Sequence, residues 1–513
     1  MRINLTQNYP IVDIQDNLVF ANNGNLVLCY KADLPEVYSL SETDFEDLHG
    51  SWFQALKSLP AGTVIHKQDV YQKLAYSAER LPNTTFLEKA THQHFKGREY
   101  ISHQTYLFFV WPKNRGLNKS KYVNPFRGIP KAIPEKMTVA VESFTASVRD
   151  AIGFLNNSYK LDFTPLKESE ILLMTDTYFN GFNQDFDTDI VLNKDHGQIG
   201  NHYFDVLAVN NELCFGDDKH KWRKLLEKRL EELSKSSNFG TQNKVVHGKI
   251  STILDQINQD DNARIVRGHL NVVFWSDRLA DLSKIASRIK TEFKELDIIP
   301  YFPKGEERKH YLLNSYCCFA SNFSDEDLYV TDLKHALCLL INNTNYKSDA
   351  TGIIFNDRQH NIPVIKDVWD EKKRRIKARN FSIFAPTGEG KSFLANNILR
   401  QYFEHGVRLV IIDLGGSYTK FAKLYPDQYI TLRYEQGKNL GINPFYINSL
   451  HDLSPERLED LTVFLLELFA SGLKVAKAQE VALKKILQHY YKHNTNETHS
   501  LEAFYNFVQQ KKE

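Results

Sequence analysis

Long apolar runs and a cysteine framework are both missing from this sequence. No stretch of about 18 or more apolar residues occurs, so we expect no membrane-spanning segment, and residues 1–5 lack the apolar core of a secretory signal. The five cysteines in 513 residues are an odd number without any C-x-x-C spacing, which argues against a disulfide scaffold and favours a reducing cytoplasm. We expect the adjacent Cys317 and Cys318 to be buried or inert thiols rather than a redox switch.

A net charge is also missing. The 64 basic and 63 acidic residues leave a formal charge of +1. Such a chain has no overall field to draw it onto nucleic acid or anionic lipid, so any contact of that kind must be local. The hydrophobic share of 42% and the charged share of 25% are typical of a folded globular protein. The length predicts roughly two to four domains.

Strand and helix patterns alternate through the first two thirds of the chain. Asn23-Gly24, between two apolar runs, predicts a tight hairpin turn. Apolar residues at three- and four-residue steps predict helices over 45–59, 141–155 and 282–293. Apolar runs predict strands at 63–70, 106–111 and 270–275, and a charge-laced stretch predicts a solvated helix over 219–237. We therefore expect residues 1–345 to form a mixed αβ region of one or two subdomains.

A glycine-rich motif lies at residues 385–392. It reads Ala385-Pro386-Thr387-Gly388-Glu389-Gly390-Lys391-Ser392 and fits the phosphate-binding loop pattern of Ala or Gly, four residues, then Gly-Lys-Ser/Thr. The run 381–384 before it alternates as a strand does. Apolar residues after it recur every four positions, as on a helix that Gly406 would end. Strand, loop and helix are thus predicted in the order that a phosphate-binding loop requires.

The motif predicts a site for a nucleoside triphosphate, with ATP the expected ligand. Successive backbone amides and the positive end of the helix dipole suit the phosphates, and Gly388 and Gly390 let the backbone approach them. Lys391 is the expected catalytic residue because its ammonium group would bridge the β and γ phosphates. The hydroxyl of Ser392 is the expected ligand of Mg²⁺. All eight residues from 385 to 392 are candidate nucleotide-binding residues.

Two later patterns resemble catalytic strands. A strand is predicted over 407–412 and ends at Asp413; since it follows the loop helix directly, we favour a loop-shaping role for Asp413 over a Mg²⁺ ligand. Residues 464–467 resemble a strand ending in a catalytic Glu, but the helical spacing of their neighbours favours a helix, and another helix is predicted around 483–490.

Two weaker patterns concern other ligands. Six cations could contact DNA phosphates or anionic lipid, although a solvated linker is favoured: Lys372, Lys373, Arg374, Arg375, Lys377 and Arg379. His92 and His94 could supply two metal ligands, but no Cys or carboxylate set at zinc spacing accompanies them, so surface histidines are favoured.

Three stretches together resemble one family. Residues 385–393, 411–418 (Ile-Ile-Asp-Leu-Gly-Gly-Ser-Tyr) and 440–445 (Leu-Gly-Ile-Asn-Pro-Phe) resemble the large ATPase of conjugative type IV secretion systems, and the TraG type of conjugative transposons in particular. The resemblance extends along the chain, but only the phosphate loop is specific enough to stand alone. It implies an α/β protein: an N-terminal region, 1–345, that docks onto the envelope-spanning machine, and a RecA-like P-loop domain, 346–513, with a helical segment at 451–513.

The resemblance also implies partners, a location and an activity. The family's motor hydrolyses ATP as a hexamer at the cytoplasmic face of the inner membrane, beside other subunits of the secretion system. Its acidic strand motif, catalytic Glu and arginine finger have no counterpart in this sequence, so we expect the RecA-like domain to be incomplete here. Three functions therefore stay open: a motor ATPase, a scaffold that binds nucleotide without turnover, and a related DNA translocase. The near-neutral charge disfavours the translocase.

Overall fold

The chain divides into two compact units, which are described separately. One comprises Met1–Ile383 with Glu404–Gly406, and the other Phe384–Phe403 with Val407–Glu513. The computed structural model describes residues 2–4, 9–77, 85–112, 135–158, 160–180, 189–209, 219–236, 241–259, 264–296, 298–324, 327–345, 347–357, 360–370, 379–438, 441–470, 475–494 and 498–510. None of the helices in these ranges combines the length and hydropathy needed to cross a bilayer.

A six-stranded antiparallel sheet forms the centre of the first unit. Four strands follow the order β2-β3-β4-β6, β5 lies at the outer side of β6, and β7 pairs with β4. The strands are β2 (Ile11–Gln15), β3 (Leu18–Ala21), β4 (Leu26–Asp33), β5 (Val64–Ala75), β6 (Glu99–Trp111) and β7 (Asp162–Pro165). The predicted hairpin is confirmed as β3–β4, and Gly24 in its turn has a φ of 86°, which glycine adopts without strain.

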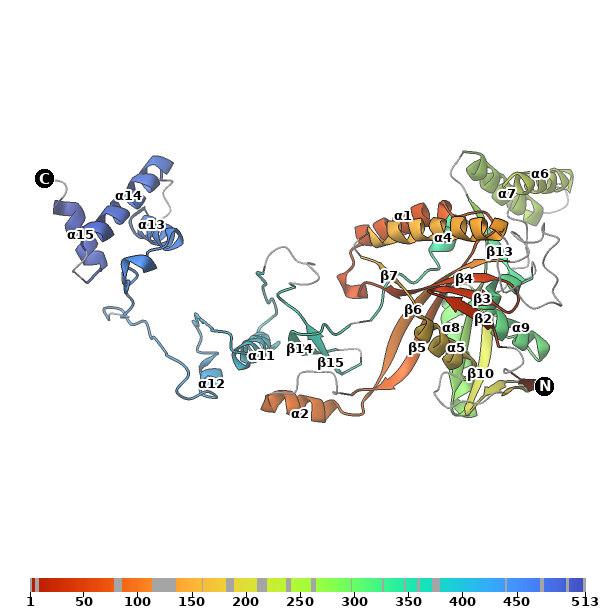
Figure 1. The fold of residues 1–513 in the computed structure, drawn as a ribbon, viewed down its shortest axis with the longest axis horizontal. Helices are drawn as coiled ribbons and strands as arrows, with labels where there is room; N and C mark the ends of the chain where they lie inside the picture. The colour runs from red at the N-terminus through yellow and green to blue at the C-terminus, as the bar shows by residue number, and fades with distance from the viewer. Residues whose placement is uncertain are drawn as a thin grey trace. The chain divides into compact units, whose positions relative to one another are not determined.

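The alternation of side chains along β4 and β6 gives this sheet two buried faces. Leu28 and Phe109 belong to a core shared with α1 (Glu42–Lys57) and α4 (Glu135–Asn156). Figure 1 shows these two helices lying along one face of the sheet. Their neighbours Cys29 and Phe108 point into a second core. Both helices appear where the apolar spacing predicted them.

The second core lies between the six-stranded sheet and a five-stranded sheet of order β1-β8-β9-β10-β12. Its strands are β1 (Arg2–Asn4), β8 (Asp189–Leu192), β9 (Gly197–Ile199), β10 (His202–Val209) and β12 (Leu270–Ser276). The core also takes in residues of α5 (Glu168–Phe179), α9 (Glu306–Asn314) and the 3-10 helix η3 (Cys317–Asn322). Cys29, Cys317 and Cys318 are buried free thiols there, as expected for the adjacent pair.

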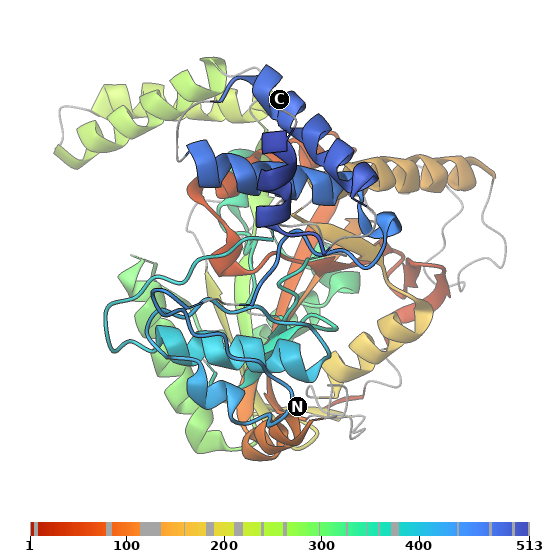
Figure 2. The ribbon, with the colours of Figure 1, turned by 90° about the vertical axis from the view of Figure 1, so that its left-hand side faces the viewer.

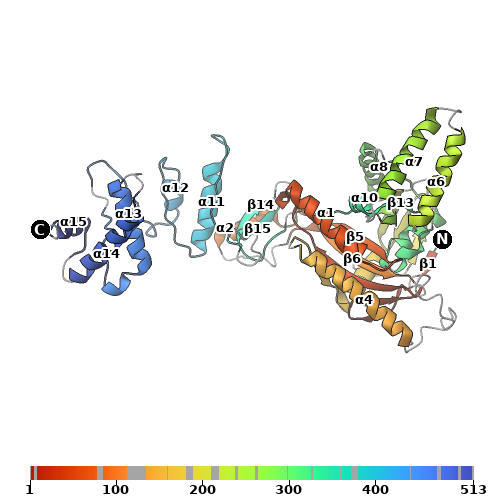
Figure 3. The ribbon, with the colours of Figure 1, turned by 90° about the horizontal axis from the view of Figure 1, so that it is seen from above.

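Helices complete this unit. The predicted helix α8 (Leu279–Glu295) covers β10 and β12 through Leu207, Phe274 and Leu282. The predicted charged helix is α6 (Lys219–Ser236); Figures 2 and 3 show it side by side with α7 (Thr241–Gln259), joined by a small apolar cluster around Leu226 and Leu254. The remaining elements are η1 (Val37–Ser39), α2 (Phe86–Phe95), β11 (Ile265–Gly268), β13 (Tyr329–Asp332), α10 (Leu333–Leu337), β14 (Ile353–Asn356) and β15 (Pro363–Lys366).

The hairpin β14–β15 packs with the first unit although it lies beyond the expected boundary at residues 345 and 346. Ile362 is buried against Tyr76 and Phe95. Lys366 forms an ion pair with Glu36, whose carboxylate also accepts a hydrogen bond of 2.7 Å from the backbone amide of residue 347. Contacts therefore assign residues through 383 to the first unit.

The second unit is built from helices in its described residues. They are α11 (Lys391–Glu404), α12 (Thr419–Ala422), η5 (Leu450–Asp452), α13 (Pro455–Ala470), α14 (Lys477–His493) and α15 (Leu501–Gln510). Leu465 and Tyr490 are fully buried in the core that α13, α14 and α15 share. The preference for a helix over a catalytic strand at 464–467 is confirmed, because these residues lie in α13.

The strands predicted at 381–384 and 407–412 are wrong. Neither segment is paired into a sheet, and Phe384, Val410 and Ile412 are 91%, 95% and 90% exposed. Apolar runs of this kind suit central strands, which need hydrogen-bonding neighbours on both edges. Within the described residues no strand lies beside either segment. The pattern identifies apolar side chains, but it does not show whether neighbouring strands are present to pair with them.

Candidate nucleotide-binding site

The glycine-rich loop leads directly into α11. Gly388 and Gly390 have φ angles of 92° and 85°, a region that side-chain-bearing residues rarely adopt. Apart from the adjoining residues of the chain, no atom lies within 4 Å of the position that a Cβ would take at either glycine. The amide of Leu394 donates to the carbonyl of Gly390 at 2.9 Å, which begins the helix. The loop backbone is therefore turned and uncovered at the end of the helix that carries the positive partial charge.

Lys391 lies against the start of the loop. Its Nζ donates to the carbonyls of Ala385 at 2.7 Å and Pro386 at 3.1 Å. An ammonium group carries three N–H bonds, so these two acceptors leave one for a further oxygen. Ser392, the next residue of α11, is exposed. The lysine and the serine are thus at the same helix end as the two glycines.

The far end of α11 ends as the sequence predicts. Gly406 has a φ of 83°, and the amide of Val407 donates to the carbonyl of Tyr402 at 3.0 Å. This is the hydrogen bond of a Schellman cap, which glycine favours. The predicted helix is confirmed as α11, in which Ile398 is buried but Leu394 on the same predicted face is exposed.

Asp413 closes a turn rather than ending a strand. Its Oδ2 accepts a hydrogen bond from the amide of Tyr418 and its Oδ1 one from the amide of Gly415, both at 3.0 Å. These backbone donors, the Tyr418 amide first, hold the pKa of the Asp413 carboxyl below its usual value. Both carboxylate oxygens are engaged by the turn, which favours the loop-shaping interpretation over a metal ligand.

Two parts of the sequence match known protein families. Residues 352–513 match the TraG P-loop domain. This part of the chain is a TraG-type P-loop domain. Residues 2–50 match a second family, described only as a domain of unknown function (DUF3875). The comparison with curated proteins gives no match.

The family match indicates a class of function for the part of the chain that contains the loop. P-loop domains bind nucleotides, and the TraG type is that of a conjugation-related ATPase. The match is consistent with a RecA-like fold after the mixed αβ region. It starts at residue 352 and so includes β14–β15, which pack with the first unit.

One polar contact of the TraG P-loop domain was not predicted from the sequence. Asn396 of α11 donates from Nδ2 to the carbonyl of Ser392 at 2.7 Å and, more weakly, to that of Ser417 at 3.4 Å. The only hint in the sequence is its place four residues after Ser392, on the same helix face. Asn396 thereby joins α11 to the turn that Asp413 closes.

His92 and His94 have separate hydrogen-bond partners. His92 is buried, and its Nδ1 makes a hydrogen bond of 2.6 Å with the hydroxyl of Tyr76, while Nε2 of His94 lies 2.9 Å from Arg98. The expectation of surface histidines is wrong for His92, because α2 turns this residue inward. No group of metal-ligating side chains was found within the described residues.

Five of the six clustered cations, from 372 to 377, lie outside the described residues, and Arg379 is near the ring of Trp369.

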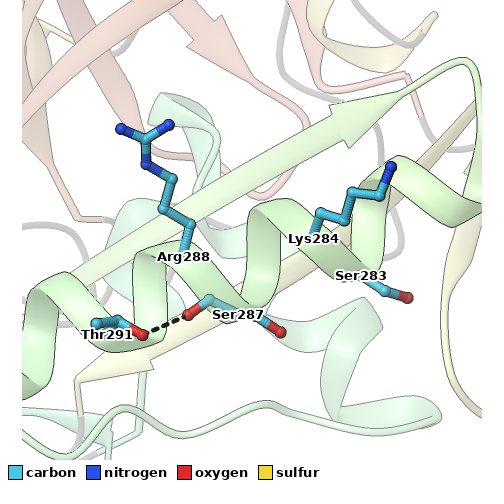
Figure 4. A pocket seen from close by; sticks show the side chains of 5 residues that line it. All are labelled: Ser283, Lys284, Ser287, Arg288 and Thr291. Atoms are coloured by element: carbon cyan, nitrogen blue, oxygen red, sulfur yellow. Dashed lines mark hydrogen bonds between the residues drawn. The ribbon is translucent and has the colours of Figure 1, made fainter.

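A surface hollow lies on α8 of the first unit. Figure 4 shows Lys284 and Arg288 on one side of the helix and the hydroxyl side chains on the other. Its lining residues are Ser283, Lys284, Ser287, Arg288 and Thr291. Because all five are exposed residues of a single helix, they form an open surface, and we assign it no chemistry.

Proposed function

We propose that this chain is the ATP-binding motor component of a conjugative type IV secretion system. Through ATP hydrolysis in the complete protein it would energise the transfer of DNA or protein, or assembly of the machine. The observation that carries the proposal is a phosphate-binding loop, 385–392, inside a TraG P-loop domain. The positive-φ glycines and the adjoining helix end support it, since both suit a bound phosphate.

The roles proposed for individual residues follow from charge. The amides from Ala385 to Ser392 would bind the phosphates, with Gly388 and Gly390 giving close access. Lys391 would stabilise charge that develops on the γ-phosphoryl group, which is what a phosphoryl-transfer site must do. The exposed hydroxyl of Ser392 fits a Mg²⁺ ligand, since hard cations prefer oxygen. Bound Mg²⁺ would neutralise the phosphates.

The proposed partners and location rest on the family. The first unit would dock onto other subunits of the secretion system at the inner face of the cell membrane, and complete copies would assemble as hexamers. A formal charge of +1 gives no support to direct DNA contact, so DNA handling would fall to partners or to local patches.

The test in cells is Lys391→Ala in the intact protein. We expect the substitution to abolish conjugative transfer, because the γ-phosphate loses its only lysine in the loop. Lys423→Ala is the matched control, since it removes an exposed lysine of the same unit outside the loop. Transfer at wild-type frequency by the Lys391→Ala strain would rule out the motor proposal.

A nucleotide-binding scaffold without turnover is the second candidate, favoured by the engagement of both Asp413 oxygens with backbone amides. Steady-state phosphate release by the purified chain separates the two. Clear turnover that Lys391→Ala abolishes would exclude the scaffold. Tight, salt-sensitive DNA binding would instead point to a translocase.

A further inference from the structure

The segment after α11 folds back onto this helix at two places. Near its C-terminal end, the ring of Phe403 lies 4.7 Å from that of Tyr425, and Phe421 completes the aromatic cluster. Near its N-terminal end, Asn396 reaches the carbonyl of Ser417. The aromatic cluster anchors α12 on the helix. Asn396 therefore joins the preceding turn, 413–418, to the helix near the phosphate loop.

The donors and acceptors at Asn396 have one consistent arrangement. The side chain of a helical residue leans toward the helix N-terminus, so residue 396 reaches back to the carbonyl of residue 392. Both neighbours of the amide nitrogen are carbonyl oxygens, which only accept. A rotated amide would place Oδ1 against them and is disfavoured. Oδ1 is itself buried without a hydrogen-bond partner, so the side chain is held through its nitrogen.

We propose that Asn396 is a positioning residue of the nucleotide site, which fixes Ser392 and the 413–418 turn relative to each other. This inference rests on the proposed binding of nucleotide at residues 385–392. Asn396 touches no phosphate in the proposed arrangement. It acts through Ser392, the proposed Mg²⁺ ligand, by holding the carbonyl of that residue. Its effect should therefore appear when Mg²⁺ accompanies the nucleotide, and not when the loop binds phosphates alone.

The experiment measures equilibrium binding of ATP to the full chain, once with Mg²⁺ and once with a chelator. Asn396→Ala removes the amide without adding charge, and Asn396→Asp keeps the shape but places a carboxylate against two carbonyls. We expect Asn396→Ala to weaken Mg²⁺-ATP binding about fivefold, as the loss of a hydrogen bond of about 1 kcal/mol implies. Asn396→Asp should weaken it further, and Asn396→Ala should leave binding in chelator within about twofold.

Asn397→Asp is the matched control for charge. Asn397 is the next residue of α11, and its Oδ1 accepts a hydrogen bond of 3.2 Å from Arg400, which a carboxylate can still accept. ATP binding by this variant should change little. The additional loss of affinity in Asn396→Asp then measures the effect that is specific to residue 396. Helix content by circular dichroism should be unchanged in all three variants.

Two results would overturn the assignment. One is unchanged Mg²⁺-ATP binding in both Asn396 variants. The other is an equal loss with and without Mg²⁺ in Asn396→Ala, which would indicate a general structural role. If the proposed nucleotide binding at residues 385–392 is itself wrong, the result differs from both: ATP would bind equally well to the wild type and to Lys391→Ala, or to neither.

Discussion

The two units of this chain differ in how far they bury their apolar segments. In the first, both faces of the six-stranded sheet are covered, so Trp52, Phe108 and Phe109 are fully buried. In the second, α13–α15 bury a core of their own, but Val410 and Ile412 in the apolar segment 407–412 remain exposed. Similar apolar patterns therefore led to opposite burial. An apolar strand pattern thus becomes a strand only where neighbouring strands are present to pair with it.

Substitution of one apolar side chain in each unit should have very different costs. Trp52 of α1 packs edge-to-face on Phe163, with ring centroids 5.5 Å apart. We expect Trp52→Ala to lower the free energy of unfolding of the first unit by about 3–5 kcal/mol, because it leaves a cavity. Val410→Ala in the exposed segment should cost less than about 0.5 kcal/mol. Urea unfolding measures both, and comparable losses would show that Val410 is buried in solution.

Nucleotide should stabilise only the second unit. At about 100 times its dissociation constant, a ligand that binds only the folded state adds about 2.7 kcal/mol. We expect Mg²⁺-ATP to raise the unfolding temperature of the transition that includes α11, and to leave the transition of the two sheets in place. Differential scanning calorimetry measures both transitions. The same upward shift in Lys391→Ala would contradict the assignment of the loop.

The junction hairpin should depend on its ion pair. The side chains of Lys366 and Glu36 are 22% and 17% exposed, so they are only partly screened by solvent. We expect Lys366→Met to lower the free energy of unfolding by about 1–2 kcal/mol, between the values for exposed and buried pairs. Lys73→Met is the control, because its pair with Glu99 is 67% and 62% exposed and should contribute less than about 1 kcal/mol. Equal losses of unfolding free energy in the two variants would show that the Lys366 pair is as exposed to solvent as the Lys73 pair.

Stability should also depend weakly on pH through a carboxylate at the start of α1. A hydrogen bond from Lys160, and then the bonds with Ser41, lower the pKa of Asp44 from 3.8 to about 2. Because this pKa is lower in the folded state, its contribution to stability is present above about pH 4 and is lost as pH falls toward 2. Asp44→Asn should be less stable than the wild type at pH 6, and the gap should narrow on acidification.

Urea midpoints between pH 6 and pH 2 measure this gap for Asp44. Glu46→Gln on the same helix controls for loss of a carboxylate. A gap that stays constant down to pH 2 would refute the assigned shift.

Local patterns predicted much of this molecule. The turn at Gly24, the helices α1, α4, α8 and α11, and the cap at Gly406 depend on neighbours within a few residues, and the sequence contains those neighbours. The phosphate loop was predictable for the same reason. The inward turn of His92 onto Tyr76 and the bond from Asn396 to Ser417 depend on how elements pack, and no local spacing encodes that. The failed strands at 381–384 and 407–412 belong to this second class.

The placement of β14–β15 bears on how this protein can be cut and recombined. The TraG family match begins at residue 352, yet Ile362 and Lys366 find their packing and charge partners in the first unit. A fragment starting at 352 would carry an orphaned hairpin with newly exposed apolar surface. Exchange of P-loop domains between relatives is better joined after residue 366, where the hairpin stays with the partners that hold it.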